Sequence, residues 1–251
     1  MTRVTLRQVS RLLGLVLLCL LSLQLFFLVR IAVMAVIDPQ STSFQRSEAW
    51  RLLTEHGRIE WSQQWVADDR IAASLKRAAI ASEDAAFAEH GGVDWEAVER
   101  AWDRNLRAEA RAERHNSLND KRSRPRVEPK VIGGSTITQQ LAKNLFLSGE
   151  RTPLRKAQEF ALTFALEACL SKRRILEIYL NNVEWGEGLF GAQAAARHYY
   201  RIDAAHLAAL PAARLAVMLP APKRFEKRPG SPYVAGRAAT VVARMGAVEL
   251  P

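Results

Sequence analysis

The chain has 251 residues, enough for a membrane anchor and one domain with a hydrophobic core of its own. Its formal net charge of +10 favours an anionic partner, such as a phospholipid surface, a phosphorylated ligand or nucleic acid. Two cysteines and five scattered histidines exclude a disulfide framework and argue against a Cys/His metal cluster.

A long apolar run lies near the start of the chain. Three arginines precede apolar-rich residues 12–29, and after Arg30 the chain stays apolar to Ile37. A bilayer-spanning helix needs about 20 such residues, whereas a cleavable signal peptide has a shorter core and a small-residue cleavage site. We therefore expect residues 1–37 to be a cytoplasmic N-terminus and a transmembrane anchor. The leading arginines place the rest of the chain on the far side of the membrane.

Residues 38–46 contain a proline and several hydroxyl side chains and are predicted to be a linker. From there on, apolar residues recur at helical spacing, and no segment shows a convincing strand period. We expect an all-α domain over residues 47–251. Residues 107–130 are crowded with charges and nearly lack apolar residues, which predicts a mobile or solvated insert. Its net basic charge leaves contact with anionic headgroups as an alternative.

The most distinctive stretch is 133–144, which holds two glycines, three hydroxyl residues, two glutamines, a lysine and an asparagine. Ser135 or Thr136 is predicted to cap a helix there. Gln140 and Lys143 then lie on its first turns, and a helix start with a nearby lysine is suited to binding phosphate. A capped helix with a solvated polar face is the simpler alternative.

Glu83 follows an apolar helical pattern and is expected at the end of a helix, where it can face a cleft. Burial there would raise the pKa of the carboxyl group and prepare it for proton transfer. His90 and Asp94 flank two glycines, which is typical of a turn held by polar side chains. A surface carboxylate and a loop histidine are the alternative that these residues leave open.

Arg155 and Glu159 are four residues apart in a predicted helix and therefore share one face. Taken alone, they form either part of a site or an ordinary surface ion pair, which contributes little stability. Cys169 lies in the apolar stripe of the same helix. It is expected to be a small buried residue, since no catalytic base is suggested beside it.

Together, five stretches resemble the signatures of glycosyltransferase family 51, the peptidoglycan polymerases, in that family's order. They are Glu83-Asp84-x-x-Phe87-x-x-His90-x-Gly92-x-Asp94, Gly133-Gly134-Ser135-Thr136-Ile137-Thr138-Gln139-Gln140-x-x-Lys143-Asn144, Arg155-Lys156-x-x-Glu159, Lys172-x-x-Ile175-Leu176-Glu177-x-Tyr179-Leu180-Asn181 and Leu219-Pro220-x-Pro222. The match covers nearly all of the chain after the linker. It implies a lysozyme-like glycosyltransferase domain behind one transmembrane helix, with no room for a transpeptidase domain. The basic segment between the first two signatures is longer than family members usually carry.

The resemblance also implies an activity: polymerisation of lipid II into β-1,4-linked glycan strands, with inversion and release of undecaprenyl pyrophosphate. Glu83 matches the family's general base, and Glu159 matches its second catalytic glutamate. Lys143 and Arg155 match the residues that bind the pyrophosphate. The remaining matches are expected to bind or shape the substrate site; they are Ser135, Thr136, Gln140, Asn144, Asp84, Phe87 and His90.

The implied partners are lipid II, the growing glycan strand, the membrane, and a cell-division or cell-wall synthesis complex, with no nucleic acid. The implied location is the bacterial inner membrane, crossed once, with the catalytic domain in the periplasm. No cofactor is certain and no metal ligand is assigned, although the family leaves open a divalent cation, Mg²⁺ or Mn²⁺, at the pyrophosphate.

Two other functions fit parts of the pattern. Paired carboxylates in a helical domain also suit a lysozyme-like peptidoglycan hydrolase. Lys143 and Arg155 argue against it, because hydrolysis of an uncharged glycosidic bond needs no pyrophosphate site. A non-catalytic membrane-anchored scaffold would leave Glu83 and Glu159 without a role.

Overall fold

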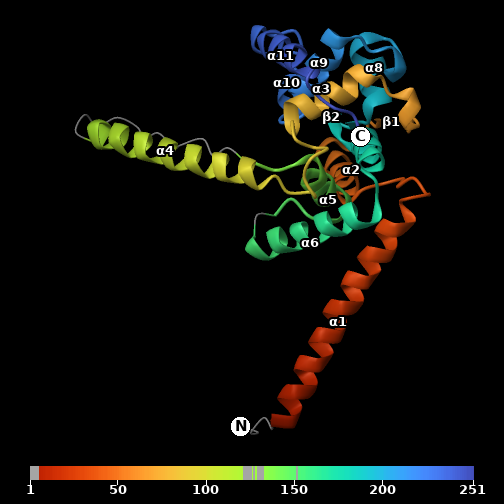
Figure 1. Cartoon of the computed structure of the whole chain (residues 1–251), viewed down its shortest axis with the longest axis vertical. Helices are drawn as coiled ribbons and strands as arrows, with labels where there is room; N and C mark the ends of the chain where they lie inside the picture. The colour runs from red at the N-terminus through yellow and green to blue at the C-terminus, as the bar shows by residue number, and fades with distance from the viewer. Residues whose placement is uncertain (1–5, 121–125, 127, 129–132, 151) are drawn as a thin grey trace.

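The computed structural model describes the whole chain except residues 1–5, 121–125, 127, 129–132 and 151. Helices dominate it, as expected (Figure 1). They are α1 (Leu6–Val33), α2 (Ser43–His56), α3 (Ala73–Glu83), α4 (Trp95–Asp120), α5 (Ile137–Phe146), α6 (Pro153–Cys169), α7 (Lys172–Asn182), α8 (Ala192–Tyr200), α9 (Ala209–Met218), α10 (Pro222–Phe225) and α11 (Pro232–Met245). Short 3-10 turns cover Asp68–Arg70 and Ala204–His206. The prediction of an all-α domain is confirmed.

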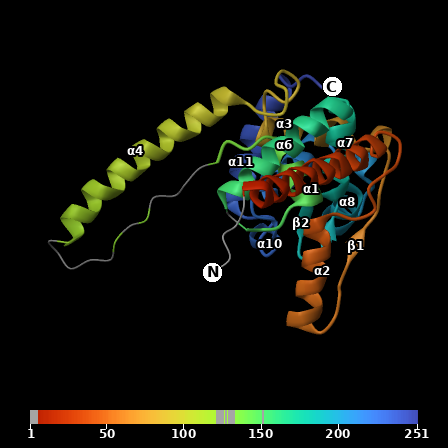
Figure 2. The same cartoon turned by 90° about the horizontal axis from the view of Figure 1, so that it is seen from below.

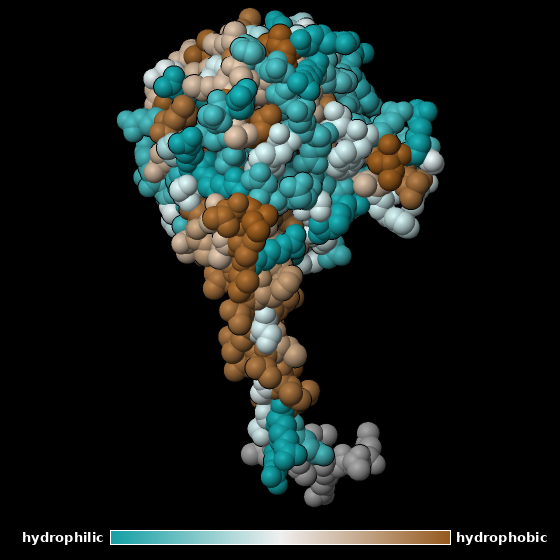
Figure 3. All heavy atoms as spheres, turned by 90° about the vertical axis from the view of Figure 1, so that its right-hand side faces the viewer, coloured by the Kyte–Doolittle hydropathy of each residue, from teal (hydrophilic) through white to brown (hydrophobic). Residues whose placement is uncertain are grey.

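Helix α1 is long and apolar enough to cross a membrane. Helix α1 projects from the rest of the molecule, so that a hydrophobic helix extends below a mostly hydrophilic body (Figure 3). Its C-terminal half is tied to the domain: Gln24 exchanges two hydrogen bonds with Gln158 of α6, at 2.8 and 3.2 Å. Phe27 also packs edge-on against Phe146 at the end of α5. The anchor is therefore docked on the domain rather than merely tethered to it.

The helical domain also contains a small sheet, in segments that show no strand period. Three very short strands, β1 (Ser62–Gln63), β2 (Glu184–Gly186) and β3 (Leu189–Phe190), form a sheet in the order β1-β3-β2. Strands β2 and β3 are an antiparallel hairpin, and β1 pairs in parallel with β3. Strands of two or three residues are too short to show a two-residue period, so the pattern could not reveal them.

Two element boundaries also differ from expectation. Helix α2 begins at Ser43, inside the predicted linker, because Thr42 and Gln45 form a capping box at its N-terminus. Helix α4 continues through Asp120 into the segment predicted to be mobile or solvated, and it extends away from the body in two perpendicular views (Figure 1, Figure 2). Most of the predicted insert beyond Asp120 lies outside the described residues.

The core positions α5 at the centre of the molecule. Ile137, Leu141 and Leu145, spaced four residues apart, are fully or almost fully buried. This stripe packs α5 against α2, α6 and α7, while α3, α9 and α11 pack together above it (Figure 1). Because one face of α5 is committed to the core, its opposite face is free to line a site.

Candidate active site

The N-terminus of α5 is built as predicted, with Thr136 as the cap. The Thr136 hydroxyl accepts from the Gln139 amide at 3.2 Å, and the Gln139 side chain accepts from the Thr136 amide at 3.0 Å. This reciprocal pair satisfies two amide groups that the first turn leaves unpaired. It sets the helical phase, which places Gln140, Lys143 and Asn144 on the face away from the core stripe.

Glu83 is the last residue of α3 and is partly buried. Its Oε2 accepts a hydrogen bond of 2.9 Å from Gln140 Nε2 on α5. Burial raises the pKa of Glu83 above its ordinary value, and the neighbouring Asp84 charge adds to the rise. The Gln140 hydrogen bond and the Lys143 charge oppose it. A carboxyl group tuned upward in this way is suited to act as a general base.

Tyr179 of α7 fixes the orientation of Gln140. The Tyr179 hydroxyl donates to Gln140 Oε1 at 3.0 Å, which leaves the amide nitrogen of Gln140 facing Glu83. Tyr179 is almost completely buried, and this burial raises its pKa well above the ordinary value. The hydroxyl therefore stays protonated and remains a donor. The sequence pattern alone does not predict this supporting role of Tyr179.

Asp84 and His90 join the end of α3 to the start of α5. The Gly92 amide donates to His90 Nδ1 at 3.1 Å, so the proton of a neutral His90 ring lies on Nε2, which contacts Asp84 Oδ1 at 2.8 Å. Asp84 Oδ2 accepts from the Ile137 amide at 2.9 Å. The Thr136 hydroxyl donates to the Gly92 carbonyl at 2.6 Å. These contacts confirm the predicted polar turn and position Glu83 beside α5.

Glu159 of α6 is 3% exposed and forms two ion pairs. Its Oε2 accepts from Arg155 at 2.8 Å, and its Oε1 contacts Lys156. The pair Arg155–Glu159 is thus not an ordinary surface pair. Arg155 Nε is buried and has no hydrogen-bond partner among the described residues. A buried donor of this kind is suited to an anionic ligand.

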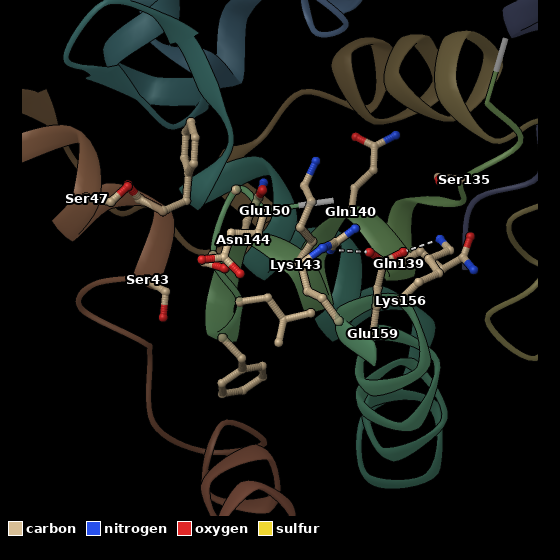
Figure 4. A pocket seen from close by; sticks show the side chains of 16 residues that line it. Ser43, Ser47, Ser135, Gln139, Gln140, Lys143, Asn144, Glu150, Lys156 and Glu159 are labelled. Carbon is tan, nitrogen blue, oxygen red and sulfur yellow. Dashed lines mark hydrogen bonds and ion pairs between the residues drawn. The ribbon is translucent and has the colours of Figure 1, made fainter. Parts of the chain in front are cut away.

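The face of α5 opens into a cleft of about 640 Å³. Helix α2 forms one wall and α6 the other: Ser43 and Ser47 come from α2, and Lys156 and Glu159 from α6, with Lys143 between them (Figure 4). The other polar residues that line it are Ser135, Gln139, Gln140, Asn144, Ser148, Glu150 and Arg155. The cleft therefore combines three cationic side chains with many hydrogen-bond donors.

A second cavity of about 340 Å³ adjoins the first, and Ser135 lines both. Its walls come from the end of α3, the start of α4, the loop before α5 and the end of α11. Glu83, Asp84 and Thr136 line it together with Arg100, Arg104 and Arg244. Glu83 thus faces the second cavity and reaches the first through Gln140.

Of the predicted site residues, all except Phe87 and His90 line one of the two cavities. Phe87 is completely buried beneath the Lys172 ammonium group and lines neither cavity. His90 supports Asp84 and does not face a cavity either. Lys156 stands beside Arg155 in the third signature but was not assigned to the site. The α2 residues and the arginines of the second cavity were missed because only the tertiary fold brings them there.

The described residues do not form a divalent cation site at this cleft. Glu159 uses both carboxylate oxygens on cationic side chains, and nowhere in the described part of the chain do three His, Cys, Asp or Glu side chains converge. A magnesium or manganese site needs several free oxygen ligands.

The site places a carboxyl group of raised pKa beside a cleft lined by three cationic side chains. The family model described as transglycosylase matches residues 51–246, and the chain belongs to that family. It is a glycosyltransferase. Biosynthetic peptidoglycan transglycosylases of Burkholderia pseudomallei and Burkholderia thailandensis are 51% and 50% identical over 231 residues, which is 92% of this chain and 83% of each relative. That of Burkholderia ambifaria is 50% identical over the same length, 86% of the relative.

Proposed function

We propose that this glycosyltransferase polymerises lipid II into β-1,4-linked glycan strands and releases undecaprenyl pyrophosphate. The observation that carries the proposal is the position of Glu83 at the junction of a cation-lined cleft and a second cavity. The similarity to biosynthetic peptidoglycan transglycosylases supports the same substrate class.

In this mechanism the growing strand binds in the larger cleft with its pyrophosphate against Lys143 and Arg155. An incoming lipid II places its GlcNAc 4-hydroxyl in the second cavity beside Glu83. Glu83 takes the hydroxyl proton as the oxygen attacks the anomeric carbon. The bond from that carbon to the pyrophosphate oxygen breaks, and its electron pair leaves with the pyrophosphate. Inversion follows because the attacking oxygen and the leaving group lie on opposite faces of the sugar.

The cationic residues stabilise the charge that develops on the leaving group. Arg155 is preorganised by Glu159, and its buried Nε offers a phosphate oxygen a further donor. Lys143 is exposed to the cleft and supplies a point charge. A hydrolase that cuts an uncharged glycosidic bond gains nothing from these groups, which favours the transferase over the lysozyme-like alternative.

Replacing Lys143 with alanine should lower kcat/KM for lipid II by about 10- to 100-fold, because a charged hydrogen bond contributes about 1.5–3 kcal/mol. The measurement is the initial rate of polymerisation at several lipid II concentrations. Lys227→Ala is the matched control, since Lys227 is exposed and lines neither cavity of the site. Equal rates for the two variants would remove Lys143 from the pyrophosphate site.

We also propose that the domain rests on the outer leaflet of the inner membrane, on the periplasmic side. Gln24 and Gln158 are half-buried and hydrogen bond to each other, which satisfies both amides where α1 meets α6. Gln24 lies inside the apolar run of α1, seven residues before Ile31, which is buried against the domain. Seven residues correspond to about 10 Å along the helix. Helix α6 therefore contacts α1 within the apolar span. Exposed apolar side chains also occur on the neighbouring helices, namely Leu154 and Phe164 on α6 and Trp95, Trp102 and Leu106 on α4. Trp95 stacks on Phe160 of α6, which joins the two sets.

This orientation predicts that Trp102 lies in lipid. Trp102 of α4 and Trp50 of α2 are 67% and 68% exposed, so they form a matched pair. A spin label at position 102, in full-length protein lacking Cys19 and Cys169 and reconstituted in vesicles, should collide with oxygen more than with a water-soluble nickel complex. A label at position 50 should show the reverse. Free access of the nickel complex to position 102 would contradict the orientation.

A further inference from the structure

Helix α2 is held to the domain by an ion cluster around the buried carboxylate of Glu48. Glu48 is 4% exposed and accepts from Arg51 through both carboxylate oxygens, at 3.0 and 2.7 Å. Lys223 of α10 donates to the same carboxylate at 2.6 Å. Arg51 also contacts Glu187, just after β2. The ion cluster of Glu48, Arg51, Lys223 and Glu187 thus ties α2 to α10 and to the hairpin.

Glu184 of β2 is a buried carboxyl group beside this cluster. It is 7% exposed, and its Oε1 is 3.4 Å from Lys223 Nζ without hydrogen-bond geometry. Lys223 and Glu226 face it from α10 and its C-terminal end, and Glu48 faces it from α2. Burial raises the pKa of Glu184 to about 7, with a further rise from Glu48 and Glu226 that Lys223 opposes. Its charge therefore changes near neutral pH.

The same elements support the wall of the larger cleft. Glu184 is paired in the hairpin with Phe190 of β3. Phe190 is fully buried and packs edge-on against Phe44 of α2, with ring centroids 6.1 Å apart. Phe44 lines the cleft together with Ser43 and Ser47. Glu48 and Arg51 of the cluster lie one turn along α2 from Phe44 and Ser47 of the cleft, on the same side of the helix. The ion cluster therefore holds the part of α2 that adjoins the cleft wall.

We propose that Glu184 is a positioning residue for polymerisation, which controls through Lys223 and Glu48 how firmly α2 is held as the wall of the larger cleft. When Glu184 is protonated, Lys223 binds Glu48 alone and the cluster holds α2 tightly. When Glu184 is ionised, it draws Lys223 away and repels Glu48 and Glu226. The wall loosens, and the growing strand binds less tightly. The inference rests on the proposed function only in one respect, namely that the growing glycan strand is the ligand of the larger cleft.

The test compares wild-type protein with Glu184→Gln, which keeps the side-chain volume and stays neutral at every pH. For the wild type, KM for lipid II should rise by at least about fivefold between pH 6 and pH 8, as expected for a modest coupling free energy. The protection of the α2 amides against hydrogen exchange, corrected for intrinsic exchange rates, should fall over the same range. In Glu184→Gln, both quantities should stay at their low-pH values.

Glu55→Gln is the matched control, because Glu55 is an exposed partner of Arg51 on the same helix. It should keep the wild-type pH dependence. In Lys223→Gln, the α2 amides should be only weakly protected against hydrogen exchange at both pH values. This second variant keeps the inference testable if Glu184→Gln does not fold. Exchange reports on α2 without any substrate, so it separates this inference from the proposed activity. If Glu184→Gln retains the wild-type pH dependence of α2 protection, the inference is wrong.

Discussion

Replacing Glu83 with glutamine is expected to lower kcat for lipid II polymerisation by about 10²- to 10⁴-fold, the usual contribution of a general base. Glutamine keeps the volume and a hydrogen-bonding group near Gln140 but cannot accept the hydroxyl proton. The binding of lipid II should change little. The measurement is the steady-state rate together with equilibrium binding of labelled lipid II.

The pH dependence of wild-type activity tests the same role of Glu83 independently. A base must be ionised to act, so activity should fall as pH falls through the pKa of Glu83. Because burial raises that pKa, the fall should begin above the ordinary range of a glutamate. Glu89→Gln is the control, since Glu89 is an exposed glutamate six residues further on. Wild-type turnover by Glu83→Gln would show that another group takes the proton.

Replacing Glu159 with alanine should have the second largest effect. Removing it leaves Arg155 and Lys156 beside each other without their shared partner. A buried charge that loses its partner typically costs about 3–5 kcal/mol of stability, and the partial exposure of Lys156 reduces the expected loss to about 2 kcal/mol. Activity should fall as well, because Arg155 is no longer held toward the cleft.

The measurements are the free energy of unfolding from denaturant titration and kcat/KM for lipid II. Glu96→Ala removes an exposed partner of Arg100 at the same i,i+4 spacing and should change stability by less than about 0.5 kcal/mol. Similar stability losses in the two variants would show that Glu159 forms only a surface pair.

Local patterns predicted those parts of the site that depend on nearby residues. The cap of α5 follows from the Ser135-Thr136 pair before a helical pattern, and the Arg155–Glu159 pair from a spacing of four. The anchor α1 follows from its length and composition. In each case the interacting groups lie within one helix, so the spacing already defines the geometry.

Contacts between distant segments could not be predicted in this way. The Tyr179–Gln140 hydrogen bond joins residues 39 positions apart and depends on how α7 packs against α5. The ion cluster on α2 likewise depends on α10. The extension of α4 past residue 107 was missed for another reason: its few apolar residues predicted a mobile or solvated segment, whereas these residues are helical up to Asp120.

The most direct test of the central claim is incubation of the detergent-solubilised full-length protein with labelled lipid II, followed by treatment of the product with muramidase. We expect a polymer that muramidase degrades, and no polymer from Glu83→Gln. Absence of polymer, together with cleavage of preformed glycan strands by the wild-type protein, would contradict the transferase mechanism and identify a hydrolase.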